Sequence, residues 1–582
     1  MHRVRLALLA TVLTGACRPA TRQVPVVPAP FPGPGAPRPT AVLPPIPLVE
    51  GPLAPRVVYP QLNQFIQSRD STFILGSVGN GKATLTINGQ PVPVQPNGAY
   101  LAFLPIPPPT AAQYELVAVL GADTVRSTHP VRVAGMTPPI PDSLRPPPPT
   151  VVDTTPTWVI LGDSVSVAQD TDRVIIGRPG PNETYRWFLF PGTRVQLTGF
   201  YPGYTRIRLD SDLQIWVLAG DARTFARDTT PPRRVAGNAR VRATPEYSDF
   251  IIPIAERPAY FVEEKDRSIE LTLYDTRGNT DLVNYPTSDA LISHIEWTQE
   301  RSDRVRYAVH LDQAPFGYLV LYENNALVLR VRRKPGPVGQ YPRATTDGSP
   351  PGSQPTSRPN SQRTADSSQP NSQRTADSSQ PTAISQRTPN VTQPNSSLNG
   401  LTIAVDPGHP PGGATGPTGF YEADAALAVG VVVERLLQER GARVVMTRTT
   451  RDPVDLQLRP TIARRANAHA LVSLHYNAYA DGQNPLRLPN GTETYFFRAH
   501  SEPLAREVQA ALAALQPLPD QGVHYRSLAL VRWSWMPSIL VEGGFIIVPE
   551  QENAMRTEAF QERYARAVVD GLEAYFRKVR SP

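Results

Sequence analysis

Residues 334–399 contain almost no apolar side chains and consist mainly of Ser, Gln, Pro, Thr and Asn. Within this stretch the unit PNSQRTADSSQ occurs twice in tandem, at 359–369 and 370–380. A segment of this composition cannot bury enough apolar surface to offset the entropy that it loses on ordering. It therefore predicts a disordered linker across 334–399, and the chain after it belongs to a different kind of domain.

Proline divides the N-terminal part of the chain again. The sequence holds 66 prolines in 582 residues, and they cluster at 18–55 and 136–157. Such stretches favour extended polyproline II spacers. Since the length also allows several domains of ordinary size, we expect a multidomain protein.

The regions between these spacers contain short β-prone runs separated by turn residues, including Asn-Gly pairs at 88–89 and 97–98. This pattern is typical of small antiparallel sandwiches and barrels. The expected units are an immunoglobulin-like sandwich at 56–135, an SH3-like barrel at 158–228 and a second sandwich at 235–333. Their isolated histidines are interpreted as structural residues, because a single strand histidine rarely forms a site: His129, His294 and His310.

The N-terminus has the order of a secretory signal, with basic MHRVR, apolar LALLATVL and then TGAC. LTGAC resembles the end of a bacterial lipoprotein signal, which implies a signal peptide at 1–17 and a lipid anchor at Cys17. Thr14 departs from the Leu usual in that position, and plain cleavage is the alternative. The apolar run of this signal is too short to span a bilayer, and no later stretch reaches the 18 apolar residues that a spanning helix needs. We therefore expect a cell-envelope location, either periplasmic or as an outer-membrane-anchored lipoprotein.

Charge and cysteine content exclude several classes of protein. The formal net charge of +7 is carried by scattered basic residues, whereas a nucleic-acid-binding protein shows a dense basic stripe. We therefore expect no nucleic acid partner. Cys17 is the only cysteine in the sequence, so the chain can form neither an internal disulfide nor a cysteine metal site.

From Leu401 onward the pattern changes to strands that alternate with helices. TIAV, ARVVMTR, ALVSLH and SILVEGGF resemble strands, whereas ADAALAVGVVVERLLQERG and the final EAFQERYARAVVDGLEAYFRK have helical periodicity. Gly441 follows the first helix as a plausible C-cap. The alternation predicts an α/β domain with a mainly parallel sheet at 401–577.

Ionisable residues lie at the ends of three of these strands. His409 follows the first strand on a Pro-Gly turn, His475 ends ALVSLH, and Glu542 lies in SILVEGGF. Glu422 stands at the start of the first helix. The carboxyl ends of parallel strands converge on one crevice, and two imidazoles with one carboxylate and an open position are typical of catalytic zinc.

The order and spacing of four sequence blocks resemble those of the type-3 family of zinc-dependent N-acetylmuramoyl-L-alanine amidases. The blocks are IAVDPGHPPGG, GFYEADAALAV, ALVSLHYNA and ILVEGGFI. The resemblance covers 401–577. It implies a zinc ion held by His409, Glu422 and His475, with Glu542 as the catalytic glutamate. Pro410 and Pro411 intervene where the family has Gly-Gly directly after the first histidine, and Ile547-Val548 replaces a frequent Ser-Asn.

The resemblance implies hydrolysis of the amide between N-acetylmuramic acid and L-alanine in peptidoglycan, for cell-wall remodelling or cell separation. Glu542 is expected to be ionised beside the metal and to move protons between water and the leaving amine. The β-domains are expected to bind envelope components. The alternative from another class is an envelope scaffold with an inactive amidase domain, favoured by the Pro410–Pro411 insertion. A zinc carboxypeptidase is a more distant alternative.

The remaining polar residues of the C-terminal domain carry weaker expectations. Asp406 is either a turn cap or a hydrogen-bond partner that orients His409. The helical arginines are expected mainly on a solvated face, with attraction of the stem peptide's carboxylates as the alternative: Arg459, Arg464 and Arg465. Three histidines are expected at the surface or rim: His469, His500 and His524. The short polar loop after His475 predicts no inhibitory helix over the metal.

Overall fold

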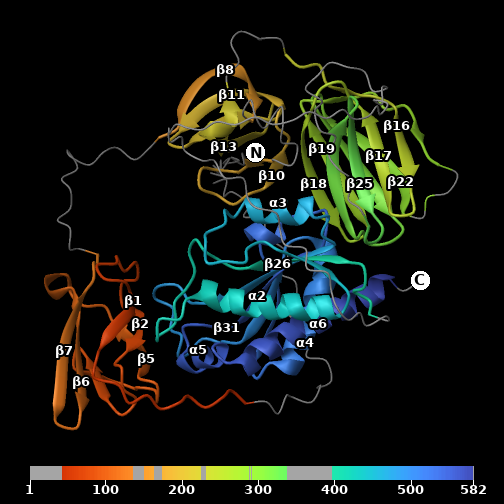
Figure 1. The fold of residues 1–582 in the computed structure, drawn as a ribbon. Helices are drawn as coiled ribbons and strands as arrows, with labels where there is room; N and C mark the ends of the chain where they lie inside the picture. The colour runs from red at the N-terminus through yellow and green to blue at the C-terminus, as the bar shows by residue number, and fades with distance from the viewer. Residues whose placement is uncertain are drawn as a thin grey trace, which may run out of the picture. The chain divides into compact units, whose positions relative to one another are not determined.

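The computed structural model describes residues 42–134, 150–162, 174–223, 231–286, 289, 291–336 and 396–580 (Figure 1). The predicted signal peptide with Cys17, the tandem repeats and most of the predicted linkers lie outside these residues. Among the described helices, none combines the length and the apolar character needed to cross a membrane.

The first β-region forms two antiparallel sheets. The strands β1 (Arg56–Tyr59), β2 (Ser71–Ser77) and β5 (Ala99–Pro105) pair in the order β1-β2-β5. The second sheet has the order β4-β3-β6-β7, with β3 (Thr84–Ile87), β4 (Gln90–Val92), β6 (Gln113–Leu120) and β7 (Asp123–Pro130). Asn88 and Gly89 both have positive φ in the turn between β3 and β4, which is the hairpin geometry that Asn-Gly favours.

The second β-region is built on a five-stranded sheet in the order β13-β12-β11-β8-β14. Its strands are β8 (Val152–Leu161), β11 (Arg194–Tyr201), β12 (Tyr204–Arg208), β13 (Gln214–Leu218) and β14 (Ala222–Arg223). The short strands β9 (Ile175–Gly177) and β10 (Trp187–Leu189) form a separate pair. Strand β8 begins at Val152 and so extends into the range expected to be a proline-rich linker.

The third β-region packs a five-stranded sheet against a four-stranded one. The order β21-β16-β17-β25-β24 comprises β16 (Ala239–Ala243), β17 (Tyr247–Pro253), β21 (Val283–Asn284), β24 (Gly317–Glu323) and β25 (Ala326–Arg332). The order β18-β19-β23-β22 comprises β18 (Ala259–Lys265), β19 (Ser268–Tyr274), β22 (Ile292–Arg301) and β23 (Arg304–Leu311). Alternating inward residues of both sheets, including Phe250, Leu271 and Tyr307, form one buried core.

The C-terminal domain contains the expected α/β architecture, and its mainly parallel sheet is confirmed. Six strands lie in the order β27-β26-β28-β31-β29-β30: β26 (Thr402–Pro407), β27 (Arg443–Met446), β28 (Ala470–Asn477), β29 (Thr492–Phe496), β30 (Asp520–Tyr525) and β31 (Ser538–Phe545). Only the β29–β31 pair within this sheet is antiparallel. The sequence pattern did not predict β30, whose residues DQGVHY lack an apolar run.

Both faces of this sheet are covered (Figure 1). The helices α2 (Glu422–Glu439), α4 (Glu502–Leu515) and α6 (Glu558–Arg580) lie on one face, where Val405, Val472 and Val541 share their core. The opposite face packs against α3 (Leu458–Arg465) and against side chains of β24 and β25. A short helix, α5 (Pro549–Met555), precedes α6. Gly441, with φ of +80°, follows the end of α2 as the sequence predicts.

His469 ties the turn before β28 to the start of β26. Its Nδ1 accepts a hydrogen bond of 2.9 Å from the Thr402 amide, and its own amide donates to the Thr402 carbonyl at 2.7 Å. His469 is partly exposed and lines a cavity together with residues of this turn. Burial lowers the pKa of His469 from 6.5 to about 4, because a charged imidazole loses its hydration there.

The folded protein should therefore lose stability as pH falls from 6.5 toward 4. Over this range the unfolded chain binds a proton at His469 whereas the folded chain does not. The difference between the two pKa values corresponds to about 3 kcal/mol. His469→Gln keeps a hydrogen-bond acceptor and removes the titration, so chemical unfolding of this variant should show a shallower loss between pH 6.5 and 4. Equal slopes for the variant and the wild type would contradict the assignment.

Candidate metal centre

Three neighbouring parallel strands bring the predicted residues together. The strands β26, β28 and β31 are adjacent, and their carboxyl ends lie at one edge of the sheet. His409 follows β26, whereas His475 and Glu542 face each other as paired residues of β28 and β31. Glu422 is the first residue of α2. The structure therefore places all four predicted residues at the same end of the sheet.

Two imidazoles and one carboxylate converge on a single point. His409 Nε2 lies 3.3 Å from Glu422 Oε1, and His475 Nδ1 lies 3.0 Å from the same oxygen. One ligand atom from each residue lies within 4.8 Å of the other two, an arrangement able to hold a metal ion. Since 26% of the His409 side chain is exposed but only 5% of the Glu422 side chain, the cluster opens to solvent on the histidine side.

The Glu422 carboxylate is fixed from several directions. Its Oε2 accepts a hydrogen bond of 2.8 Å from the Ala414 amide, and its Oε1 accepts one of 3.3 Å from the Tyr476 amide. Burial opposes its ionisation, but the hydrogen bonds and charges of His409 and His475 outweigh burial and hold the pKa of Glu422 well below its usual range. Glu422 is therefore anionic and held in place, as a metal ligand requires.

The His409 loop is held by a buried arginine. Arg459 Nη2 donates to the carbonyl oxygens of His409 at 3.1 Å and Pro410 at 2.8 Å, and Arg459 is 2% exposed. The expectation of a solvated helix face is therefore wrong for Arg459, and also for the buried Arg464. The loop carries the two prolines and still brings His409 within reach of Glu422.

Asp406 does not orient His409. Its carboxylate accepts hydrogen bonds from Ser473 Oγ at 2.6 Å, from Arg459 Nη1 at 3.0 Å and from Thr447 Oγ1. His409 instead has its Nδ1 at 3.0 Å from the Pro411 carbonyl oxygen. An Nδ1–H donated to that carbonyl leaves the Nε2 lone pair toward the cluster, so Pro411 supplies the role that we expected of Asp406.

Glycine is required where the loop passes His475. A Cβ on Gly408 would lie 2.3–2.6 Å from three ring atoms of His475, closer than any real contact. The DPG sequence is therefore a steric requirement of the site as well as a turn. Arg448 reinforces the same turn by donating to the carbonyl oxygens of Pro407 and Gly408, each at 2.9 Å.

A second carboxylate lies beside Glu542 and was not among the predicted residues. Glu493 of β29 is the strand partner of Glu542 of β31. The Glu493 carboxylate accepts a hydrogen bond from Asn477 Nδ2 and lies 3.2 Å from His524 Nε2 as an ion pair. Glu542 Oε2 is buried without a hydrogen-bond partner. Burial raises the pKa of Glu542 well above its usual range, and the charges of Glu422 and Glu493 add to this. Ionisation of Glu542 therefore requires a cation nearby.

The other histidines have different surroundings. His500 is buried, contrary to the expectation of a rim position, with its Nδ1 2.9 Å from a Glu264 carboxylate oxygen. His524 lies at the rim with 41% of its side chain exposed. His129 is buried and has its Nε2 2.9 Å from the Pro60 carbonyl oxygen, as expected of a structural histidine. His294 and His310 are not isolated, since their rings stack on each other.

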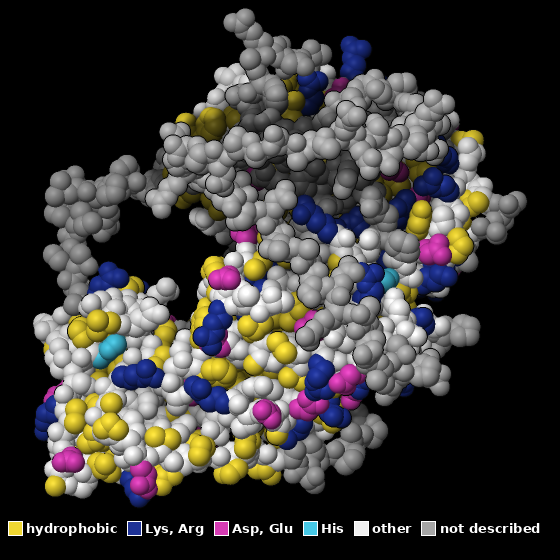
Figure 2. Space-filling model, in the orientation of Figure 1, with side chains coloured by type: hydrophobic (Ala, Val, Ile, Leu, Met, Phe, Trp, Pro, Cys, Tyr) yellow, Lys and Arg dark blue, Asp and Glu magenta, His cyan; other side chains and the backbone are white. Residues whose placement is uncertain are grey.

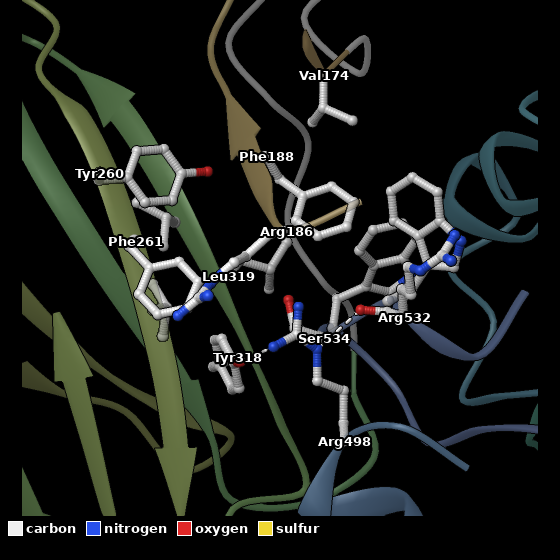
Figure 3. A pocket seen from close by; sticks show the side chains of 14 residues that line it. Val174, Arg186, Phe188, Tyr260, Phe261, Tyr318, Leu319, Arg498, Arg532 and Ser534 are labelled. Atoms are coloured by element: carbon white, nitrogen blue, oxygen red, sulfur yellow. Dashed lines mark hydrogen bonds between the residues drawn. The ribbon is translucent and has the colours of Figure 1, made fainter. Parts of the chain in front are cut away.

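A separate cavity shares no residue with this cluster. Figure 3 shows its aromatic and arginine lining, which includes Tyr260, Phe188 and Arg498. Arg498 Nη1 donates to Tyr318 Oη at 3.0 Å within it. The side chains on the molecular face in Figure 2 include both charge signs, interspersed without a dense basic stripe among the residues described there.

The C-terminal domain that carries this cluster matches a known protein family. The family model described as Amidase_3, N-acetylmuramoyl-L-alanine amidase, matches residues 403–574. Among known proteins, YqiI of Bacillus subtilis, described as uncharacterized, is 32% identical over 185 residues, or 31% of this chain and 86% of YqiI. The chain belongs to the N-acetylmuramoyl-L-alanine amidase family through this C-terminal domain.

Other known proteins are similar to a comparable share of this chain. The N-acetylmuramoyl-L-alanine amidase LytC of Bacillus subtilis is 33% identical over 201 residues, which is 34% of this chain and 39% of LytC. The chain therefore spans well under two thirds of the length of LytC. The solved structure of the N-acetylmuramoyl-L-alanine amidase AmiC2 of Nostoc punctiforme is 32% identical, covers 30% of this chain and 97% of that chain, and has a TM-score of 0.28.

Arg459→Lys should weaken metal binding at this cluster. Lysine keeps a positive charge near Asp406 but lacks the planar fork that holds the His409 and Pro410 carbonyls together. Loss of hydrogen bonds that position a metal ligand lowers metal affinity by about 10- to 100-fold. Competition between the protein and a chelator for Zn²⁺ would measure this affinity. The matched control is Arg465→Lys at an exposed position of the same helix, which should leave the affinity unchanged. Equal affinities in both variants would exclude this role for Arg459.

Proposed function

We propose that this protein hydrolyses the amide bond between N-acetylmuramic acid and L-alanine in peptidoglycan, using a zinc ion held by His409, Glu422 and His475. The observation that supports this most strongly is the convergence of these three side chains beside the partly buried Glu542. A ligand set of two imidazoles and one carboxylate with an open position is typical of catalytic zinc. Residues of an amidase family domain supply all four groups.

The donor atoms suit a zinc ion in charge as well as in number. Glu422 is anionic, and the Pro411 carbonyl favours the His409 tautomer with a free Nε2. When bound, zinc supplies a Lewis acid that activates water and polarises the scissile carbonyl. The partial exposure of His409 leaves the open side of the cluster accessible to a substrate.

Glu542 is placed to transfer the protons of the reaction. Its carboxylate accepts a proton from the attacking water and afterwards donates it to the leaving nitrogen of L-alanine. Burial favours the protonated form that the second step needs, whereas a nearby dication favours the ionised form that the first step needs. Glu493 faces Glu542 across β29 and β31 and adds to the retention of this proton.

The alternative of an inactive scaffold is less favoured. Its main support was the insertion of Pro410 and Pro411, which was expected to weaken the reach of the loop. Arg459 instead holds the carbonyls of His409 and Pro410, and His409 Nε2 lies 3.3 Å from Glu422. Residues 478–491 between β28 and β29 form a loop without a helix, so this connection carries no helical plug.

We also propose that the protein acts in the cell envelope, with residues 1–17 as a signal peptide and Cys17 as a lipid anchor. The support is the basic, apolar and small-residue order of the N-terminus and the peptidoglycan substrate that the amidase family implies. A periplasmic protein or an outer-membrane lipoprotein is consistent with this order. The three β-regions are proposed to bind envelope components.

Glu542→Gln should abolish turnover and retain the metal. The amide is nearly the same size as the carboxylate but cannot exchange protons, which costs about 10²- to 10⁴-fold in rate. The full-length protein, loaded with Zn²⁺, is mixed with isolated peptidoglycan, and the released products are identified by mass. Stem peptides that begin with alanine should appear with the wild type and be lost with the variant.

The matched control is Glu502→Gln on the surface of α4, which should release peptides at the wild-type rate. Zinc content is measured for every protein. No release by a wild type that contains zinc would favour the scaffold alternative. Release of terminal amino acids in place of whole stem peptides would favour a carboxypeptidase.

A further inference from the structure

A second cluster of metal-binding side chains lies in the third β-region, on the four-stranded sheet. His294, Glu296 and His310 each offer one ligand atom within 4.8 Å of the other two. Among the described residues, only this cluster and the one at His409 meet that condition. The sequence separates the two histidines, and neither belongs to the amidase domain.

The sheet geometry explains why the three side chains meet. His294 and Glu296 are two residues apart on β22, so both point to one face of the strand. His310 of β23 is the register partner of His294. The neighbouring residues Val309 and Leu311 are buried in the core, which places His310 on the opposite, outer face. The register therefore fixes the cluster on the outer face of the edge strand β22 and its neighbour β23.

The side chains are arranged with their ring nitrogens toward the carboxylate. The two imidazole rings stack with centroids 4.1 Å apart and planes at 6°. Glu296 reaches both, with Oε1 3.7 Å from His294 Nε2 and Oε2 3.7 Å from His310 Nε2. Ligand atoms of a tetrahedral zinc site lie about 3.3 Å apart. The separations from Glu296 are slightly longer, and the two parallel rings must tilt toward a shared ion for both Nε2 lone pairs to point at it.

Other contacts leave these atoms available. His310 Nε2 is buried and has no hydrogen-bond partner. His294 Nδ1 lies 3.3 Å from Ser293 Oγ, and a hydrogen bond donated by Nδ1–H to that oxygen leaves the Nε2 lone pair toward Glu296. The nearby cation Arg306 is paired with Glu300 at 2.7 Å and with Glu270 at 3.3 Å. Glu296 is therefore not neutralised by Arg306, and its register partner Ala308 leaves space above the sheet.

We propose that His294, Glu296 and His310 form a second binding site for a divalent transition metal of the zinc class. Two imidazoles and one carboxylate suit such a metal better than Mg²⁺ or Ca²⁺, which prefer oxygen ligands. Because His294 and Glu296 are exposed, the remaining coordination positions face solvent and can accept an external ligand. The bound metal joins β22 to β23 at the edge of the sheet.

Zinc stoichiometry of the full-length protein tests this site independently of the proposed activity. The protein is stripped with a chelator, dialysed against Zn²⁺ in the low micromolar range, and its metal content is measured by mass spectrometry. We expect two zinc ions in the wild type and one in His310→Asn. His409→Ala should also retain one, and the double variant none. Loss of zinc at one cluster therefore leaves the other measurable.

Glu300→Gln is the matched control, because Glu300 lies on the same strand and its carboxylate bonds Arg306 instead of the histidines. It should retain both ions. Thermal unfolding without Zn²⁺ checks that each variant folds. Thermal unfolding with Zn²⁺ then measures the stabilisation from each site: His409→Ala should keep the stabilisation that comes from the second site, and His310→Asn should lose it. A zinc content that is the same in the wild type, His310→Asn and His294→Asn would overturn the proposal, whatever the amidase cluster binds.

Discussion

The buried ion pair between Asp406 and Arg459 organises the amidase site. Asp406 is fully buried at the end of β26, and its carboxylate is satisfied by Arg459 of α3, Ser473 of β28 and Thr447. A buried charge is tolerated only when it is paired and hydrogen-bonded, so these elements must assemble around it together. The same guanidinium then reaches the carbonyls of the His409 loop. One interaction therefore links strand order to the position of a metal ligand.

Much of the amidase domain follows from its sequence, because parallel strands place their carboxyl ends at one edge. That rule predicted the convergence of His409, His475 and Glu542 from strand ends alone. Glu493 could not be found in this way, since it lies on β29, which runs antiparallel to β31. The sequence ETYFF indicates a strand but carries no information on its direction or on its neighbours.

The incorrect expectations have a common physical origin. The expectations rested on local context: a turn for Asp406, and a helical stretch for Arg459 and Arg464. In the structure, the partners of these side chains come from distant segments. The pairing of His294 with His310 depends likewise on the register of β22 and β23, including a bulge between Ile292 and His294. A slip of one residue would send the two rings to opposite faces. Periodicity predicts a strand, but it does not fix which residues of two strands become partners.

Glu422 occupies the first turn of α2, and this position has a consequence for cooperativity. The helix is joined to α6 by ion pairs from Arg435 to Glu562 at 2.6 Å and from Arg440 to Asp570 at 2.5 Å. The position of the Glu422 backbone beside the histidines therefore depends on the packing of this helix against α6. A metal ion held at this cluster would thereby couple its own binding to the stability of the C-terminal helices, and its removal by a chelator would lower the stability of this domain.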